Sequence, residues 1–434
     1  MDEDKKNDNG YQAEGSPLVG LIRDKFQQAE TSKIYDERRW LKAYRNYRGL
    51  YGPEMAFREN EKSRVFVKVT KTKVLASFGQ IIEVLFSQGK FPLGVTPTSV
   101  PEDIAERASL KQQGQQPPQQ PDPYGFAGDG ANIPPGATVN DLMKNLNQEY
   151  ENVGFEEGPS YTGGPQIEPA RMAAEAMQKL IHDQLEESKA ITILRHVFFE
   201  MVLLGTGILK GPFTDLKEYN SFDVAEDDNG NKVNVNIKKI KSIPSIEAVS
   251  CWDFYPDPNA TTIDDCDYVI QRHSYNKQQF EDLAEKPMFD AEAVKRCLEM
   301  GPNYQTRGFE SSLYDKENVT TIYKNRFEVL EFWGIIDRKT ADECGLSYEA
   351  TGDIIAINAW ICGNEVLRMV ENPFTPNRIP YLVCPYELNP YQFFGIGVPE
   401  NMEDSQQVMN GHARMAIDNL ALAGNLVFDV DETM

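Results

Sequence analysis

One stretch near the end of the sequence, residues 389–424, constrains the fold more than any other part. Aromatic residues open it, a turn follows at Gly395–Gly397, and Pro399 suits the first turn of a helix. Acidic residues stand where a helix dipole favours them, at Glu400, Glu403 and Asp404. Later residues recur at three- and four-residue spacing, namely Met402, Gln406, Met409, Ala413, Ala416, Ile417 and Leu420. Further apolar residues lie off this stripe, at Val408, Met415 and Leu422. The pattern predicts a long helix covered on more than one side, ending near Gly424 and followed by a strand over 426–430.

Another helical pattern runs from Leu18 to Arg48, after residues 1–17, whose polar composition predicts disorder. Its second half places Trp40, Tyr44 and Tyr47 on one face. Basic residues surround these rings, namely Arg38, Arg39, Lys42, Arg45 and Arg48. Basic and aromatic residues together are one signature of a nucleic-acid surface. Arginines that cover an amphipathic helix and stack on its rings give the same pattern, and we favour that interpretation.

A short basic segment, Lys62–Lys73, then leads into a helical pattern over 74–86. The segment holds four lysines and one arginine, namely Lys62, Arg64, Lys68, Lys71 and Lys73. Three interpretations stay open for it: a contact with the acidic face of a neighbouring subunit, a contact with a DNA backbone, and a merely solvated face. We expect residues 18–105 to form one N-terminal helical part.

The composition changes sharply in the next segment, residues 106–167, which is rich in glutamine, proline and glycine. A segment of this kind buries too little apolar surface to offset the entropy of ordering it. We expect a low-complexity surface insertion here, with one short helix near 139–152.

Residues 168–275 combine a long helical pattern with β structure. The helix is predicted to stop at Gly205-Thr-Gly207, before a strand over 208–213. This turn is no phosphate-binding loop, because Lys210 after it is followed by no hydroxyl and preceded by no second glycine in the required place. The glycines also end a helix where those of a dinucleotide fingerprint would begin one. A hairpin turn is predicted at 227–230 between two further strands.

Five aspartates lie close together after these strands, at Asp253, Asp257, Asp264, Asp265 and Asp267. They are candidate ligands for a divalent metal, but their spacing fits no EF-hand loop, and Pro256 and Pro258 interrupt any shared helical face. We favour aspartates that form turns. Residues 276–325 are then predicted to be a helical connector, and residues 326–388 a β-rich segment of alternating strands.

The composition excludes several classes of protein. A formal net charge of −23 over 434 residues argues against free, tight binding to DNA. The acidic N-terminus is no signal peptide, and the most apolar run, Val197–Leu209, is too short to span a bilayer, so no membrane partner is expected. The six cysteines show no metal-ligand spacing, which predicts reduced thiols and no metal. Because no catalytic motif occurs and only four histidines are present, we expect neither an enzyme nor a cofactor.

Several short motifs, in this order along the chain, resemble the portal proteins of tailed bacteriophages, especially the short-tailed kind. The earlier motif positions are Trp40, Tyr44, Tyr47, Gly205, Gly207, Trp252, Asp253 and Pro256. The later ones are Trp333, Gly334, Gly395, Gly397, Gln406, Asn410, Arg414 and Asn419. The resemblance covers roughly residues 39–93 and 169–430 and omits the glutamine- and proline-rich insertion.

The resemblance implies an α+β portal fold, with a helical wing, mixed β elements and a stem-type helix in residues 389–434. It also implies a structural subunit of a ring, a dodecamer, at one capsid vertex of the virion. Such a ring docks the terminase large subunit and tail adaptor proteins, contacts major capsid and scaffolding proteins, and conducts double-stranded DNA without sequence specificity. The ring assembles in the host cytoplasm. Residues 326–388 would correspond to the wing or the clip of such a portal.

Within this framework we predict specific roles for the long helix. Its apolar stripe packs against a neighbouring subunit through Met402, Met409, Ala413, Ile417 and Leu420, and its channel-charge candidates are Glu403, Asp404 and Asp418. Portals of this kind usually continue beyond this helix and strand, which suggests a longer product. Two alternatives stay open: another ring-forming capsid or adaptor protein, and a metal-dependent hydrolase built on the five aspartates.

Overall fold

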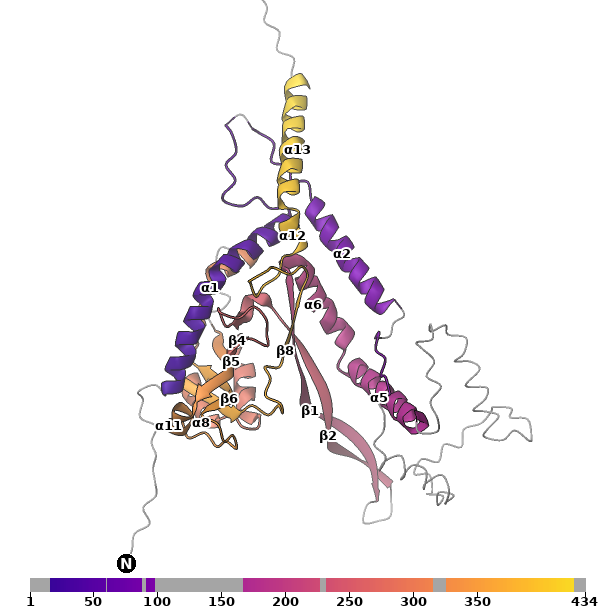
Figure 1. Cartoon of the computed structure of the whole chain (residues 1–434), viewed down its shortest axis with the longest axis vertical. Helices are drawn as coiled ribbons and strands as arrows, with labels where there is room; N and C mark the ends of the chain where they lie inside the picture. The colour runs from indigo at the N-terminus through magenta and orange to yellow at the C-terminus, as the bar shows by residue number, and fades with distance from the viewer. Residues whose placement is uncertain are drawn as a thin grey trace, which may run out of the picture. The chain divides into compact units, whose positions relative to one another are not determined.

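The computed structural model describes residues 16–59, 61–87, 91–97, 167–226, 232–314 and 325–424 (Figure 1). The chain divides into two compact units, one formed by Met1–Phe91 and Gln184–Met434, the other by Pro92–Asp183. Several predictions fall outside the described residues. They concern residues 1–15, nearly all of the insertion at 106–167, the hairpin turn at 227–230 and the strand at 426–430.

The first unit contains helices and two antiparallel sheets, which confirms the α+β class. The larger sheet has five strands in the order β3-β4-β5-β6-β7. Their bounds are β3 Phe254–Pro256, β4 Tyr268–Tyr275, β5 Phe327–Asp337, β6 Ile354–Cys362 and β7 Glu365–Glu371. Strands from the predicted segments 168–275 and 326–388 therefore pair directly, β4 with β5.

The smaller sheet has the order β2-β1-β8, with β1 Thr206–Glu226, β2 Lys232–Val249 and β8 Tyr381–Pro385. β1 and β2 pair along their length, whereas β8 pairs only with Thr206–Lys210. The alternating pattern that predicted strands at 326–388 could not show that β8 leaves its sequence neighbours. It joins a strand some 175 positions earlier, as its register with β1 shows.

Helix α1, Pro17–Arg48, covers one face of the larger sheet. Its first half buries an apolar stripe against strand residues such as Ile270, Phe332 and Ile357. The helical stripe consists of Leu18, Val19, Ile22, Phe26 and Ala29. The helix ends where Gly49 adopts a left-handed conformation, φ 78°, and donates its N–H to Arg45.

A second core lies between the C-terminal half of α1 and two further helices, α2 Val69–Phe86 and α6 Ala190–Leu204. Trp40 is its central aromatic residue, in edge-on contact with Trp252 and Phe394 at centroid distances of 5.3 and 4.8 Å. Tyr44 and Tyr47 are partly buried against the same cluster. The prediction that these three rings share one face is therefore confirmed.

Short helices complete the first unit. Their bounds are α7 Lys277–Glu281, α8 Ala291–Met300, α9 Gly308–Tyr314 and α11 Arg338–Glu343. A 3-10 turn, Cys251–Asp253, leads into β3, and another, Asp282–Glu285, follows α7. Within the predicted connector, α8 packs with Phe280 and Leu283 against strands β5–β7. The sequence pattern predicted α7 and α8 but not α9 or α11.

Three predicted helices differ in their bounds. The pattern over 168–204 forms two helices, α5 Ile167–Glu187 and α6, because Lys189 adopts a left-handed conformation, φ 54°. α2 begins at Val69, five residues before the predicted start. The long C-terminal helix is also divided, into α12 Val398–Asn401 and α13 Glu403–Gly424. In the second unit, Val95 donates its backbone N–H to the side chain of Gln178, 3.3 Å away on α5.

Candidate functional site

The two glycine turns that sequence analysis identified pack against each other. Gly205 ends α6 with φ 95° and a bond to Met201, which confirms the predicted helix stop. A Cβ atom added at Gly205 would lie 2.4 Å from the carbonyl oxygen of Gly395, and one at Gly397 would lie 2.9 Å from the nitrogen of Gly205. A Cβ at Gly207 would lie 2.7 Å from the carbonyl oxygen of Val197. Only glycine permits this backbone crossing, which explains both motifs without a phosphate ligand.

Hydrogen bonds fix the same crossing. The backbone N–H of Gly395 donates to the hydroxyl of Thr206 at 2.9 Å, and the N–H of Tyr386 donates to the carbonyl of Gly205 at 2.8 Å. Phe394 packs beside it on Trp40. The crossing thereby sets the position at which the chain enters α12 and α13.

Helix α13 buries polar side chains, which is the reverse of an ordinary amphipathic helix. The buried residues of α13 are Gln406, Asn410 and Arg414, and Asp418 continues the same four-residue spacing. We call these four residues the polar seam. All four bind the segment between α1 and α2, which crosses beside α13 (Figure 1).

The contacts of the polar seam satisfy backbone groups that have no partner of their own in a helix or sheet. Gln406 accepts from the N–H of Thr70 at 3.0 Å and its hydroxyl at 2.8 Å, and donates to the carbonyl of Val67. Asn410 accepts from the N–H of Val67 at 2.9 Å. Asp418 and Arg414 complete the seam through Ser63, Glu61 and Tyr51.

The apolar side chains of α13 point outward in the single subunit. Predicted interface residues Met409, Ile417 and Leu420 are 48%, 40% and 71% exposed. Ala413 and Met402 are partly buried. Residues off that stripe are exposed as well, namely Val408, Met415 and Leu422. The predicted interface role of this stripe stays a prediction.

The channel-charge candidates differ in their surroundings. Glu403 forms an ion pair with Lys42 of α1, and Asp418 belongs to the polar seam. Asp404 is exposed, as is Asn419, the last of the family-motif positions. The neighbouring Glu400 binds Arg39 at 3.0 Å, so acidic residues at the start of the predicted helix hold α1 against α12 and α13.

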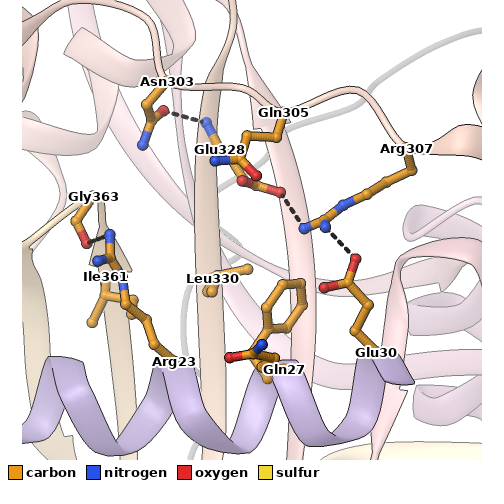
Figure 2. A pocket seen from close by; sticks show the side chains of 11 residues that line it. Arg23, Gln27, Glu30, Asn303, Gln305, Arg307, Glu328, Leu330, Ile361 and Gly363 are labelled. Carbon is orange, nitrogen blue, oxygen red and sulfur yellow. Dashed lines mark hydrogen bonds and ion pairs between the residues drawn. The ribbon is translucent and has the colours of Figure 1, made fainter. Parts of the chain in front are cut away.

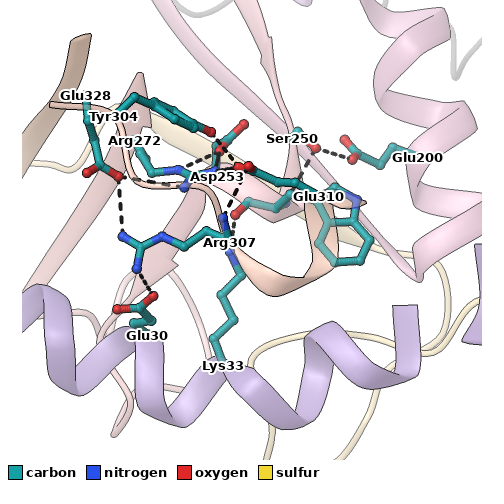
Figure 3. A network of polar contacts seen from close by, with 11 residues as sticks. Glu30, Lys33, Glu200, Ser250, Asp253, Arg272, Tyr304, Arg307, Glu310 and Glu328 are labelled. Carbon is teal, nitrogen blue, oxygen red and sulfur yellow. Dashed lines mark hydrogen bonds and ion pairs between the residues drawn. The ribbon is translucent and has the colours of Figure 1, made fainter. Parts of the chain in front are cut away.

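A charge network lies beneath α1 and joins it to the larger sheet and α9 (Figure 3). Arg272 of β4 binds Asp253 at 2.9 Å and Glu310 at 2.8 Å. Arg307 binds Glu30 of α1, and Glu328 at 3.3 Å. Asp253, a family-motif position, is therefore half of a structural ion pair. Trp252 beside it stacks on Phe309 at 4.7 Å, and Pro256 ends β3.

Lys33 enters this network from α1, as Figure 3 shows. Its ammonium donates to the carbonyl of Trp252 at 2.6 Å and lies 3.8 Å from the ring centre of Tyr255. Burial lowers the pKa of Lys33 to about 8. Nearby on α6, burial raises the pKa of Glu200 to about 7, although the hydroxyl of Ser250 donates to its carboxylate at 2.6 Å.

A second buried network surrounds Glu331 of β5. Its carboxylate binds Lys210 at 2.5 Å, His273 at 2.7 Å and the indole N–H of Trp333 at 2.7 Å. Burial alone would raise the pKa of Glu331, but Lys210 and His273 hold it at about 2. The next residue, Gly334, has to be a glycine, because a Cβ atom there would lie 2.6 Å from the Cβ atom of Tyr268. The Trp333-Gly334 motif thus serves packing.

Three of the five aspartates proposed as metal ligands, Asp253, Asp257 and Asp265, bind separate partners. Asp257 accepts from the N–H of Asn259, and Asp265 accepts from the hydroxyls of Thr261 and Thr262. Among the described residues, no group of three or more histidine, cysteine, aspartate or glutamate side chains is placed to hold a metal ion. The favoured interpretation, aspartates that form turns, agrees with these contacts.

A polar pocket of about 370 Å³ lies between α1 and the loop before α9 (Figure 2). Arg23, Glu30 and Arg307 line it, but each already binds the protein itself. Arg23 donates to the carbonyl of Gly363 at 2.7 Å, and Glu30 pairs with Arg307. A pocket whose charges are satisfied internally has no evident ligand chemistry.

The fold and these sites define a structural subunit, with buried networks that fix its shape and an exposed apolar helix. Residues 211–434 match the family model described as Phage SU10 portal protein, which is more than half of the chain. The chain belongs to this family of phage portal proteins, which is structural and not enzymatic. No curated protein matches the sequence. Within the described residues, none of the helices has both the length and the apolar character that crossing a membrane requires.

Sequence reasoning missed the residues that bear the buried networks. Lys33, Arg272 and Glu310 are almost completely buried, yet each resembles an ordinary surface charge in the sequence. Arg272 follows closely on the apolar run Tyr268–Ile270 in the same strand, and this position is the one signal in the sequence that could have identified it.

Proposed function

We propose that this chain is one subunit of the portal ring of a short-tailed tailed bacteriophage, a dodecamer by resemblance to that kind of portal. The ring stands at one capsid vertex, among capsid and scaffolding proteins, and assembles in the host cytoplasm. It docks the terminase during packaging, conducts double-stranded DNA inward and later outward, and binds tail adaptors. The chain acts through its geometry and needs neither a cofactor nor a catalytic residue. Family membership supports this proposal.

The observation that carries ring formation is the inverted character of α13. Its polar residues are used inside the subunit, while its exposed apolar residues form two stripes. At roughly 100° per residue, the stripe with Met409 and Leu420 is separated from the stripe with Met415 by about a third of the helix circumference. In a closed ring each subunit contacts two neighbours through two different surfaces. Two exposed stripes on one helix suit this requirement.

The predicted domain roles remain part of the proposal. Residues 18–105 and 168–275 belong to the wing, residues 276–325 connect, and residues 326–388 belong to wing or clip. Residues 389–434 contribute stem and channel, with Glu403, Asp404 and Asp418 as candidates for the charged channel wall. A carboxylate-lined wall repels DNA, which can then slide without sticking.

The direct experiment is the mass of the purified chain in solution, by light scattering, with negative-stain images of the same fraction. A ring of about twelve subunits with a central hole is expected by family resemblance. A monomer at all concentrations would contradict ring formation by this chain. Binding of the purified terminase large subunit to the ring then separates a portal from another ring-forming capsid or adaptor protein.

The variant Ile417→Asp tests the interface on α13. Because Ile417 is 40% exposed in the subunit, the change is compatible with folding but places an unpaired charge in the proposed interface. We expect folded monomers and no rings. The control is Met300→Asp, the same kind of change at a 66% exposed site on α8, which should leave assembly intact. Normal rings from Ile417→Asp would show that the interface lies elsewhere.

The metal-dependent hydrolase is the less favoured alternative. It requires a divalent ion at the five aspartates, and an ion bound only to the folded protein would raise its thermal stability. Unchanged unfolding temperatures with and without Mg²⁺, Ca²⁺ or Mn²⁺ are expected. An ion-dependent activity lost in Asp264→Asn would instead establish the hydrolase.

A further inference from the structure

The basic segment Lys62–Lys73 is an exposed array of cations in a strongly acidic chain. All five of its basic residues, Lys62, Arg64, Lys68, Lys71 and Lys73, are exposed. In the sequence no aspartate or glutamate occurs from Lys62 until Glu83. In the part of the chain that the structure describes, none of these five side chains forms an ion pair, although the chain as a whole has a net charge of −23.

The polar seam accounts for this lack of acidic partners. Two carboxylates beside the segment, Glu61 and Asp418, are both engaged in the seam, with Arg414 and the backbone N–H of Ser63. Ser63 and Thr70 are buried toward α13, at 8% and 0% exposure. The seam therefore fixes the backbone of the segment and leaves its cations exposed.

The array has a length that suits a nucleic-acid backbone. The seam from Gln406 to Asp418 covers twelve residues of helix, about 18 Å at 1.5 Å per residue. Double-stranded DNA carries one negative charge per about 1.7 Å of its axis, so roughly ten phosphates lie along the same length. Five cations held beside α13 can neutralise part of that charge without reading any base.

The choice of basic residue favours phosphates over an acidic protein face. The contacts that join elements of this protein mostly use arginine, whose planar fork fixes a carboxylate, as at Arg39, Arg272 and Arg307. The basic segment instead offers four lysines, which act as mobile point charges. Its one arginine, Arg64, already donates to backbone carbonyls and lies 4.0 Å from the ring centre of Phe57.

We infer that the basic segment is a sequence-independent contact site for the phosphate backbone of double-stranded DNA. The inference rests on the proposed function, because it takes the conducted DNA as the ligand. The site supplies a weak, salt-sensitive attraction within a subunit that otherwise repels DNA. Such a contact positions the duplex beside α13 and still allows it to slide.

The test uses the full chain and a fluorescent duplex of about 30 base pairs and random sequence. The protein is titrated into the duplex, and binding is followed by fluorescence anisotropy at NaCl concentrations from about 25 to about 200 mM. The test variant replaces Lys62, Lys68, Lys71 and Lys73 with glutamine. The matched control replaces four exposed lysines of the other elements, namely Lys277, Lys286, Lys295 and Lys339, and so changes the net charge equally. Thermal unfolding and light scattering are recorded on each sample.

We expect the wild type and the control to bind the duplex alike. The test variant should lose at least about tenfold in affinity at the lowest salt, and its slope of log affinity against log salt should fall by roughly 3.6, which is about 0.9 per lost phosphate contact. Equal loss in both variants, or no binding by the wild type, would overturn the inference. Unchanged DNA binding with lost self-association would assign the segment to an acidic face of a second copy. Ring formation is measured separately, so a failure of DNA binding leaves the ring proposal intact.

Discussion

Helices α1 and α13 bury opposite kinds of side chain within the subunit. α1 buries an apolar stripe under the larger sheet, and its charged residue Lys33 is enclosed in a network within the subunit. α13 buries an amide-rich seam and leaves Met409, Ile417 and Leu420 in contact with solvent. Apolar burial stabilises α1 within one subunit. Among the residues that the structure describes, no segment covers the exposed stripes of α13, which is why α13 and not α1 is the proposed assembly element.

The largest difference between the two helices should appear in the free energy of unfolding of the subunit. Trp40→Ala removes the centre of a core in which this side chain is 1% exposed, and should lower that free energy by about 3–5 kcal/mol. Tyr35→Ala, at a 62% exposed aromatic residue of the same helix, is the control and should cost under about 0.5 kcal/mol. Urea titration of both variants measures the contrast. Equal losses would mean that α1 is not held by this core.

The polar seam provides the corresponding test on α13. Gln406→Leu keeps the side-chain volume but leaves two buried donors, the N–H and the hydroxyl of Thr70, without their acceptor. Each unsatisfied buried group costs about 1–3 kcal/mol, so a loss of about 3 kcal/mol in the unfolding free energy is expected.

The adjacent glutamine supplies the control for this prediction. Gln407 is exposed and binds only Glu403 of its own helix, so Gln407→Leu should change the unfolding free energy by less than about 0.5 kcal/mol. Amide hydrogen exchange at Val67 and Thr70 should accelerate in Gln406→Leu alone. Unchanged exchange there would show that the seam does not hold the segment.

The long helix and the glycine turns were predictable because their signals are local. A run of residues at helical spacing predicts a helix wherever it packs, and Gly205 ends α6 for a reason present in its own backbone. The role of Gln406 was only partly accessible. It was assigned to the apolar stripe by its spacing, although its side chain is 1% exposed and bonded to Thr70, more than 300 positions away in the sequence.

The buried charges show more clearly what could not be predicted from the sequence. Nothing in the spacing of Lys210 and Glu331 indicates that they meet, since the pairing requires β1 and β5 to be brought together by the whole fold. The helix breaks at Met402 between α12, which contacts α1, and α13, and the local pattern did not indicate this break. Local periodicity identifies an element, but long-range pairing decides which of its faces is buried.

The charge network beneath α1 gives the smallest of these effects and one with a distinct pH dependence. Burial raises the pKa of Glu200 from 4.5 to about 7, so the folded protein binds this proton more tightly than the unfolded chain. The stabilisation by the proton is complete below about pH 4.5 and is lost as the pH rises through about 7. Between pH 5 and pH 7 the loss amounts to about 2 kcal/mol in the unfolding free energy.

Glu200→Gln isolates this contribution, because glutamine keeps an acceptor for the hydroxyl of Ser250 but does not titrate. Wild type should lose about 2 kcal/mol relative to this variant between pH 5 and pH 7, measured by urea titration at each pH. Glu299→Gln, at an exposed glutamate of α8, should follow the wild type. Parallel pH profiles for wild type and Glu200→Gln would show that Glu200 is ionised in the folded subunit throughout, and that Lys33 and its neighbours stabilise the charge. The network under α1 would then be closed by ion pairs alone, whereas the buried side of α13 combines the amides of Gln406 and Asn410 with the ion pair of Arg414 and Glu61.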